Sequence, residues 1–236
     1  MYIYRTNIKL SLPVLVLVLL TLSTITLIYL YAFDKLPDKW ASIVGGMAIS
    51  SLVSLIQFSI NYKTYKSSEK LEDSGVKKFL KTRGDKEYYS LLINDANKEF
   101  KLIFHTSKRF FEDFCQDEAG DNLLVSKLDK NSEITVKMLL LDEGYLSDED
   151  KAAFEISKNE ILRLTKKYPK RFFVRFYKHT PNHNLFLTEK DAVIGPYFEN
   201  TKGKYLPSIH FRSNAEFVQP YKDYFDKEWE DAQNTN

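Results

Sequence analysis

The chain has 236 residues, of which 44% are hydrophobic and 28% are charged, and its net charge at pH 7 is +2. The strongly apolar stretches all precede Tyr62, and the 62 residues up to that point hold four bases and two acids, which leaves 30 of each (34 less 4, and 32 less 2) for the rest. A neutral remainder excludes a domain that coats duplex nucleic acid through bulk charge, while a local basic patch stays open. The single cysteine excludes an intrachain disulfide.

Two uncharged stretches near the N-terminus predict a pair of membrane-spanning helices. Residues 10–33 carry no charge, and a run of about 20 apolar residues is long enough to cross the hydrocarbon core. A cleaved signal peptide is the alternative, but this run is longer than a typical signal core and no small-residue cleavage site follows it. Residues 40–62 are also uncharged, and the connection of 34–39 is so short that the two helices must run antiparallel. We therefore expect a transmembrane hairpin over 1–62.

The distribution of basic residues predicts the orientation of this hairpin. Arg5 and Lys9 precede the first helix, and a series of lysines follows the second: Lys63, Lys66, Lys70, Lys77 and Lys78. Basic residues flanking membrane helices stay on the cytoplasmic side. We therefore expect a multi-pass protein of the inner (plasma) membrane, with the bilayer as its first partner and with both termini and the soluble domain in the cytoplasm.

A small and polar stripe runs along the second apolar segment. Its members recur at helical spacing: Ser42, Gly46, Ser50, Ser54 and Gln57. Small side chains let helices approach closely, so one interpretation is tight helix packing. The other is the wall of an oligomeric pore, where a weakly polar face meets water. Both interpretations predict a homo-oligomer, because a two-helix hairpin offers this stripe only one internal partner.

The remaining sequence predicts a stalk over 63–84 and an α/β sandwich domain over 85–236. We expect helices over 85–98, through 110–114 and over 147–169, the last with a capping box at Ser147 and Asp150. Strands are expected at 101–104, 134–141, 172–177 and 208–212, and a hairpin is expected from 185–188 and 192–198. A final helix after a cap at Asn214 presents Phe217, Tyr221, Tyr224, Phe225 and Trp229.

The stretch 134–232 resembles the phospholipase D-like superfamily. The resemblance rests on a hydrophobic strand ending Leu-Leu-Leu-Asp, a long helix, a strand, a hairpin ending Ala-Val-Ile-Gly, a closing strand and an aromatic helix. It implies a phospholipase D-like fold for most of the soluble domain. Active members of that family carry a His-x-Lys-x-x-x-x-Asp motif on the hairpin, followed by Gly-Ser and Asn.

The catalytic motif of the resembled family is missing here. Aligning the hairpin places the family's histidine on Asn182, its lysine on Asn184, its aspartate on Glu189 and its serine on Pro196. Using His183 as the histidine instead puts Leu185 in the lysine position. Phosphodiester chemistry needs an activated imidazole and cationic phosphate clamps, so we expect no catalytic residues and no enzymatic activity.

Polar residues at the ends of predicted strands suggest a binding site for a phosphate-bearing ligand. A helix is expected to start just after the strand that ends at Phe104, and a helix start favours an anion. The candidate residues are His105, Thr106, Ser107, Lys108, Arg109, Lys178, His179, His183 and Arg212. The alternative is that these are helix caps and ordinary surface residues. We expect no metal at His179 and His183, because the loop between them lacks helical spacing and no third ligand is evident; no cofactor is expected.

These features favour an oligomeric membrane effector or channel whose cytoplasmic domain senses a nucleotide or short oligonucleotide and gates the membrane helices. Bacterial antiviral effectors have this general plan, and the resemblance of architecture suggests such a role. One alternative is a membrane-tethered phosphodiesterase or nuclease that uses His105 or His183 in a non-standard way. Another is an inert anchor that holds a protein partner at the membrane.

Overall fold

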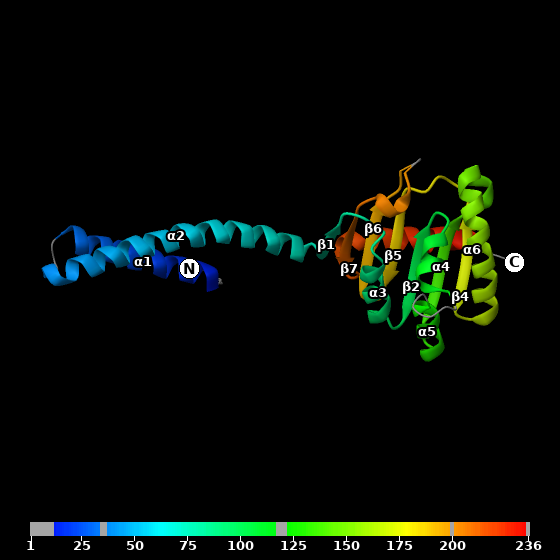
Figure 1. Ribbon diagram of the computed structural model, residues 1–236, viewed down its shortest axis with the longest axis horizontal. Helices are drawn as coiled ribbons and strands as arrows, with labels where there is room; N and C mark the ends of the chain where they lie inside the picture. Colours follow the sequence, from blue (N-terminus) through cyan, green and yellow to red (C-terminus); the bar gives the residue numbers. More distant parts are fainter. Residues whose placement is uncertain (1–11, 34–36, 117–121, 199–200, 235–236) are drawn as a thin grey trace, which may run out of the picture. The chain divides into compact units, whose positions relative to one another are not determined.

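The computed structural model describes residues 12–33, 37–116, 122–198 and 201–234. The chain divides into two compact units, 1–70 and 71–236, and each is described by itself. The first unit is built from helices, and the second combines a sheet with helices on both of its faces (Figure 1).

The first unit contains helix α1 (Leu12–Ala32) and most of helix α2 (Asp38–Asp73). Both helices are long and apolar enough to cross a membrane, by length and composition alone. They contact each other through few groups. The hydroxyls of Thr24 and Ser51 lie 2.7 Å apart, and the ring of Tyr31 lies against Gly45, where an added Cβ would meet a ring carbon at 2.9 Å. Most of their apolar side chains are exposed in this unit.

The face of α2 that meets α1 differs from the stripe identified in the sequence. Gly45, Ala48 and Ser51 face α1, and Ala48 is buried. The residues of the stripe are all exposed: Ser42, Gly46, Ser50, Ser54 and Gln57. Ser42 and Gly46 border a groove of about 410 Å³ between the helices. The stripe is therefore not consumed by packing within the hairpin, and its use in self-association stays a prediction.

The second unit is organised around one mixed sheet. Its strands are β1 (Val76–Leu80), β2 (Glu99–Phe104), β3 (Thr135–Leu141), β4 (Phe172–Tyr177), β5 (His183–Thr188), β6 (Asp191–Pro196), β7 (Ser208–Arg212) and β8 (Gln233–Asn234). The strand order is β1-β7-β6-β5-β2-β3-β4-β8. The central strands β2, β3 and β4 run parallel, and every other pairing is antiparallel. The domain is therefore a mixed α/β fold, with β1 and the two-residue β8 at its edges.

Helices cover the sheet on both sides, with most of them on one face. Helices α3 (Lys86–Asp95), α4 (Lys108–Phe114), α5 (Leu123–Lys130) and α6 (Asp148–Lys167) lie in front of the sheet in Figure 1, and α7 (Gln219–Asp231) lies behind it. Short helical turns occur at Glu143–Tyr145, Gly203–Tyr205 and Glu216–Val218. Strand β3 is buried on both faces, which explains its nearly continuous apolar sequence.

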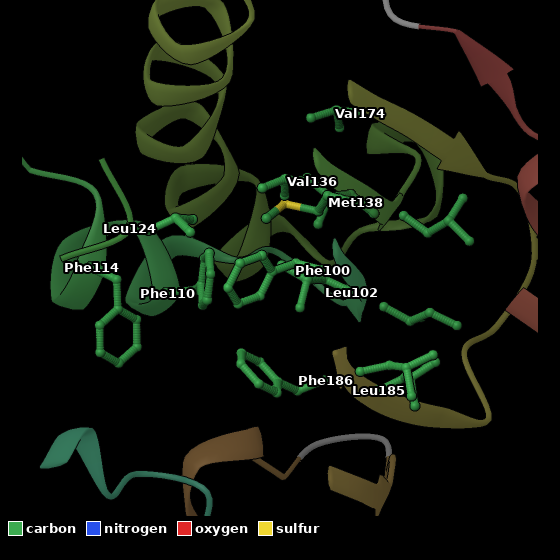
Figure 2. Close-up of a cluster of buried hydrophobic side chains, with 14 of the residues drawn as sticks. Phe100, Leu102, Phe110, Phe114, Leu124, Val136, Met138, Val174, Leu185 and Phe186 are labelled. Atoms are coloured by element: carbon green, nitrogen blue, oxygen red, sulfur yellow. The ribbon is translucent and has the colours of Figure 1, made fainter. Parts of the chain in front are cut away.

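The main core lies between the sheet and the helices of the front face. Figure 2 shows Phe100 and Leu102 of β2 beside Phe186 of β5, with Phe110 of α4 and Leu124 of α5 among the surrounding side chains. The rings of Phe100 and Phe186 meet edge to face, with their centroids 6.1 Å apart. Such aromatic pairs add about 0.5–1.5 kcal/mol to the burial of their area. This packing fixes β2 and β5 side by side, and it is their shared end that carries the site described below.

Two sequence predictions need correction. The expected stalk over 63–84 is shorter than predicted: the second helix does continue, and α2 ends at Asp73 just before Gly75, but β1 then joins the sheet by pairing with β7. Strand β1 was not predicted, because its sequence, Val-Lys-Lys-Phe-Leu, lacks the alternation of apolar and polar residues that is typical of a half-buried strand. Asn214 does not cap the last helix, which begins at Gln219 after a helical turn. The cap at Ser147 is confirmed, since its Oγ accepts from the Asp150 backbone N–H at 3.2 Å.

Candidate functional site

The antiparallel pairing of the strands brings several chain segments to one edge of the sheet. The parallel strands β2, β3 and β4 end there, as do β1 and β6, while β5 and β7 begin there. We call this the carboxyl edge. In open α/β sheets, the crevice outside the carboxyl ends of the strands is the usual place for a ligand. In Figure 1 the loop between β6 and β7, drawn in orange, lies at this edge.

Arg83 is the central cation of the carboxyl edge. It follows β1 in a loop, and its Nε donates to the carbonyl oxygen of Gly203 at 2.9 Å. In the orientation that satisfies both of its amide atoms, the side chain of Asn184 accepts from Arg83 Nη1 and, at 3.3 Å, from Nη2. Asn184 is the second residue of β5. Its side chain lies on the same face of the sheet as that of Phe186, two residues further along the strand. The guanidinium is therefore held by neutral oxygens.

The charge of Arg83 has no negative partner among the residues that the structure describes. Burial lowers the pKa of the guanidinium, and only the Tyr89 phenol opposes that shift. Burial also raises the pKa of Tyr89 to about 12, so this phenol is neutral at physiological pH. A half-buried cation without a counter-charge is costly, and an anion that reaches it recovers part of that cost.

Two glycines let the backbone approach this guanidinium. A Cβ added to Gly195 would lie 2.9 Å from the Pro207 carbonyl oxygen and 3.3 Å from Arg83 Cδ. A Cβ added to Gly203 would lie 3.2 Å from Arg83 Nη2. Gly195 pairs with Asn184 across β5 and β6, so the same side of the sheet supplies both contacts. The side chain of Arg83 is thus fixed by close contact with backbone on two sides.

His105 lies at the same edge, immediately after β2. Its Nε2 is 3.1 Å from Asp150 Oδ2 at the start of α6, and its ring stacks on Tyr197 with centroids 5.0 Å apart. Ser147 donates to the same carboxylate oxygen of Asp150 at 2.8 Å. The other ring nitrogen, Nδ1, is buried and has no partner within the described part of the chain. The ring is therefore oriented by Asp150, with one nitrogen left for a further contact.

The start of α4 holds five of the residues predicted to bind an anion, and most of their polar groups already have partners within the helix or the loop before it. Ser107 adopts the left-handed conformation with φ of 57°, and its Oγ donates to the Thr106 carbonyl instead of capping the helix. Lys108 lies 3.7 Å from Glu112 and Arg109 lies 3.1 Å from Asp113, one turn further along. These cations already have carboxylate partners, and α4 has only seven residues. That this helix start holds the ligand stays a prediction, but its cations already have partners, whereas Arg83 has only neutral ones among the described residues.

His183 lies on the opposite face of the sheet, under α7. Its ring packs against Tyr221 and Tyr224, with centroids 5.0 and 4.9 Å away. Burial lowers the pKa of His183, and Glu228 partly offsets this. The neighbouring cavity, lined also by Tyr177 and Asn182, measures about 10 Å³, which holds about one water. This cavity is therefore too small for a nucleotide.

The remaining predicted residues fall at different places. Lys178 is exposed just past the end of β4, at the carboxyl edge. Arg212 ends β7 at the opposite edge, where it donates to the carbonyl oxygen of Glu72, so it does not join the other predicted ligand-binding residues at the carboxyl edge. His210, the remaining histidine, lies in the middle of β7 and is buried. Arg83 was not among the predicted ligand-binding residues, because the segment that contains it was assigned to the stalk.

The positions that align with the catalytic motif of the resembled family are also accounted for. Asn184 contacts Arg83, Asn182 borders the small cavity, and Pro196 pairs with His183. Glu189 lies at the far end of β5, where its carboxylate accepts from the backbone N–H groups of Asn97 and Lys98 at 2.6 and 3.4 Å. Within the residues that the structure describes, no group of three His, Cys, Asp or Glu side chains is arranged to hold a metal ion.

Comparisons with known proteins give likenesses of structure only. No family model and no curated protein sequence matches the chain. Among solved structures, TrmBL2, described as an archaeal chromatin protein with a novel mode of DNA binding, aligns at 12% identity over 81% of this chain and 70% of its own, with a TM-score of 0.48. Two phospholipase D-type structures are also similar. Nuc from Salmonella typhimurium aligns at 12% identity over 65% of this chain and 92% of its own, with a TM-score of 0.41. NucT from Helicobacter pylori aligns at 13% identity over 67% and 100%, with a TM-score of 0.41.

The two histidines near Glu228, His179 and His183, are expected to make the stability of the protein depend on pH. Burial is the largest single influence and lowers the pKa of His179, but the 2.8 Å hydrogen bond to Glu228, the hydrogen bond to the Thr180 carbonyl and the charge of Glu228 together outweigh it and raise the pKa above the ordinary value. The pKa of His183 is lowered. His179 thus contributes stability that is present below pH about 6.5 and is lost as the pH rises through its folded-state pKa. His183 costs stability as the pH falls from about 6.5 through its own folded-state pKa.

Replacing Glu228 with Gln should lower the pKa of both histidines, since the carboxylate raises each of them. The pKa of His179 should fall more, because it loses its charged hydrogen-bond partner. NMR titration of the imidazole resonances in the full-length protein provides the measurement. A pKa of His179 that is unchanged in Glu228→Gln would contradict the described contact.

Proposed function

We propose that this protein is a membrane-anchored, self-associating effector whose α/β domain binds a phosphate-bearing ligand at the carboxyl edge. In this proposal the domain has a phospholipase D-like fold without the family's catalyst, and ligand occupancy changes the association or opening of the membrane helices. The same proposal places the domain in the cytoplasm, on the distribution of basic residues around the apolar helices, and assigns a role in bacterial antiviral defence, on a resemblance of architecture.

The observation that carries the proposal is the uncompensated guanidinium of Arg83. Its described partners are the Gly203 carbonyl and the Asn184 amide, both neutral. A guanidinium has five N–H donors in a rigid fork that suits phosphate oxygens, and charged hydrogen bonds of this kind are among the strongest in proteins. His105, with a buried unpartnered Nδ1 at the same edge, adds a second polar group.

Aromatic side chains favour a nucleotide or short oligonucleotide over inorganic phosphate. Tyr145 follows β3, and Phe198 and Tyr205 lie in the connection between β6 and β7, so all three belong to loops at the carboxyl edge. Each of them is more than half exposed. Exposed aromatic rings beside a cation are the elements on which bases stack in proteins that bind single-stranded nucleic acid. The near-neutral domain also fits a small ligand better than duplex DNA.

The membrane part of the proposal rests on the composition and exposure of α1 and α2. Apolar side chains such as Leu22 and Ile49 are 57% and 68% exposed in the first unit. Soluble proteins rarely leave large contiguous apolar surfaces in water, because each buried Å² is worth about 25 cal/mol. A bilayer covers this surface, and the exposed stripe containing Gly46 offers a face for a second copy.

A phosphodiesterase is the second candidate function, and one arrangement favours examining it. Tyr88, His210 and Asp191 stand in the order of nucleophile, base and orienting acid, with the Tyr88 hydroxyl 2.5 Å from His210 Nδ1 and His210 Nε2 2.7 Å from Asp191 Oδ1. A nucleophile is activated by an adjacent general base or by a lowered pKa. Burial and the Asp191 charge raise the pKa of Tyr88, so the arrangement disfavours a phenolate nucleophile.

Membrane anchoring predicts that the full-length protein resists extraction by alkaline carbonate. Replacing Leu22 with Arg should release a large fraction of it, because a charge at the centre of a membrane helix costs about 2.5–3.5 kcal/mol on insertion scales. The matched control is Leu91→Arg, which places the same charge on an exposed leucine of α3. Wild-type protein in the carbonate-soluble fraction would contradict the anchoring.

Anion binding predicts that Arg83→Gln weakens affinity for pyrophosphate, ATP and a short oligothymidylate about ten- to a hundredfold, the range expected for a lost charged hydrogen bond. Arg171→Gln is the matched control, because Arg171 precedes β4 at the opposite end of the sheet, where it donates to the carbonyl oxygens of Leu128 and Asn131. Isothermal titration calorimetry on folded full-length protein in detergent measures both. Equal losses in the two variants, or no loss in Arg83→Gln, would refute Arg83 as the centre of the site.

A further inference from the structure

Strand β1 connects the membrane helix to the candidate ligand site. Helix α2 ends at Asp73, β1 spans Val76–Leu80, and Arg83 follows after two further residues. Among the described strands, only β1 has the end of the apolar helix α2 just before its first residue and Arg83 just after its last residue. The five residues of β1 are therefore the shortest covalent path between the two features.

Strand β1 is held only weakly in the sheet, although it links the end of α2 to Arg83. It lies at the edge of the sheet and pairs only with β7 in the described part of the chain. Its register with β7 is irregular between Val76 and Lys78, and Phe79 is largely exposed. Edge strands with few backbone partners and little apolar burial belong to the parts of a protein that open most readily.

A buried polar network compensates for this weak position. Lys77 of β1 forms an ion pair with Asp191 of β6, and the same carboxylate oxygen lies 2.7 Å from His210 Nε2 of β7. His210 Nδ1 in turn meets the hydroxyl of Tyr88 in α3. Asp191 is 2% exposed and His210 5% exposed. The network thus ties β1 to three other elements through a carboxylate that is shielded from water.

The corner before β1 is fastened as well. Gly75 has φ of +81°, which a side chain disfavours, and its carbonyl oxygen accepts from the Arg212 backbone N–H at 2.7 Å. The Arg212 side chain donates to the carbonyl oxygen of Glu72, near the end of α2. The end of α2 is therefore held through the same strand, β7, that pairs with β1.

We propose that β1 is a latch strand, which opens and closes separately from the central strands and which an anion at Arg83 holds closed. The proposal rests on the proposed function for its ligand. An anion that joins Arg83 to the Asn184 and Gly203 region adds a tie at the carboxyl end of β1, while the Lys77, Asp191, His210 and Tyr88 network fixes its middle. The occupancy of the ligand site then determines how firmly the end of α2 is held.

Hydrogen–deuterium exchange of full-length protein in detergent tests the latch. In wild-type protein, amides of β1 should exchange faster than those of β3, and Lys77→Met should accelerate β1 about tenfold while leaving β3 unchanged. Lys81→Met is the matched control, because it removes the same charge from an exposed residue just past the strand. Pyrophosphate or ATP should slow exchange in β1 of wild-type protein and have no effect in Arg83→Gln.

The outcomes separate the latch from the ligand site on which it depends. Protection around Asn184 without protection of β1 would leave the anion site in place and overturn the latch. Equal exchange of β1 and β3, or no acceleration in Lys77→Met, would also overturn it. No protection anywhere in the protein by either probe would remove the anion site itself and the tightening that it provides.

Discussion

One electrostatic constraint underlies the candidate site: a half-buried guanidinium whose described hydrogen-bond partners are neutral. Arg83 contacts the Gly203 carbonyl and the Asn184 amide, while backbone at Gly195 and Gly203 prevents it from moving aside. A lysine in this place would present its donors from a single nitrogen, without the rigid planar fork that lets Arg83 reach the Gly203 carbonyl and the Asn184 amide through separate nitrogens. The cost of burying this charge is what makes an anionic ligand favourable at the carboxyl edge.

The strand order decides which residues share that edge. Because β5 runs antiparallel to both β2 and β6, the loop after β1, the end of β2 and the connection after β6 all meet where β5 begins. The same order separates residues that seem related in the sequence. His105 contacts α6 on one face, His183 contacts α7 on the other, and Arg212 lies at the far edge. One sheet therefore carries a polar site on one face and a tightly packed cluster on the other.

The elements that could be predicted from the sequence are those with strong local signals. The long helix after Ser147 has a capping residue and regular apolar spacing, and the continuous apolar run of β3 marks a central strand. Strand β1 could not be predicted in this way. Two lysines occupy its middle, and one of them is compensated by Asp191, which lies more than a hundred residues away in the sequence. Only the pairing with β7 makes this segment a strand.

The candidate site was predictable in location but not in composition. Strand ends indicated the carboxyl edge, and His105 lies there as expected. Lys108 and Arg109 were attractive because they begin a helix, but Glu112 and Asp113 neutralise them one turn later. Arg83 carried no motif, since its proposed role follows from the lack of a counter-charge among the described residues and from backbone contacts that only the folded chain creates. The Arg83 Nε–H resonance in ¹⁵N NMR measures the central claim directly during titration with pyrophosphate. The account predicts that this resonance shifts saturably while those of Arg109 and Arg212 stay in place; an unmoved Arg83 resonance, or parallel and unsaturable shifts of all three, would contradict it.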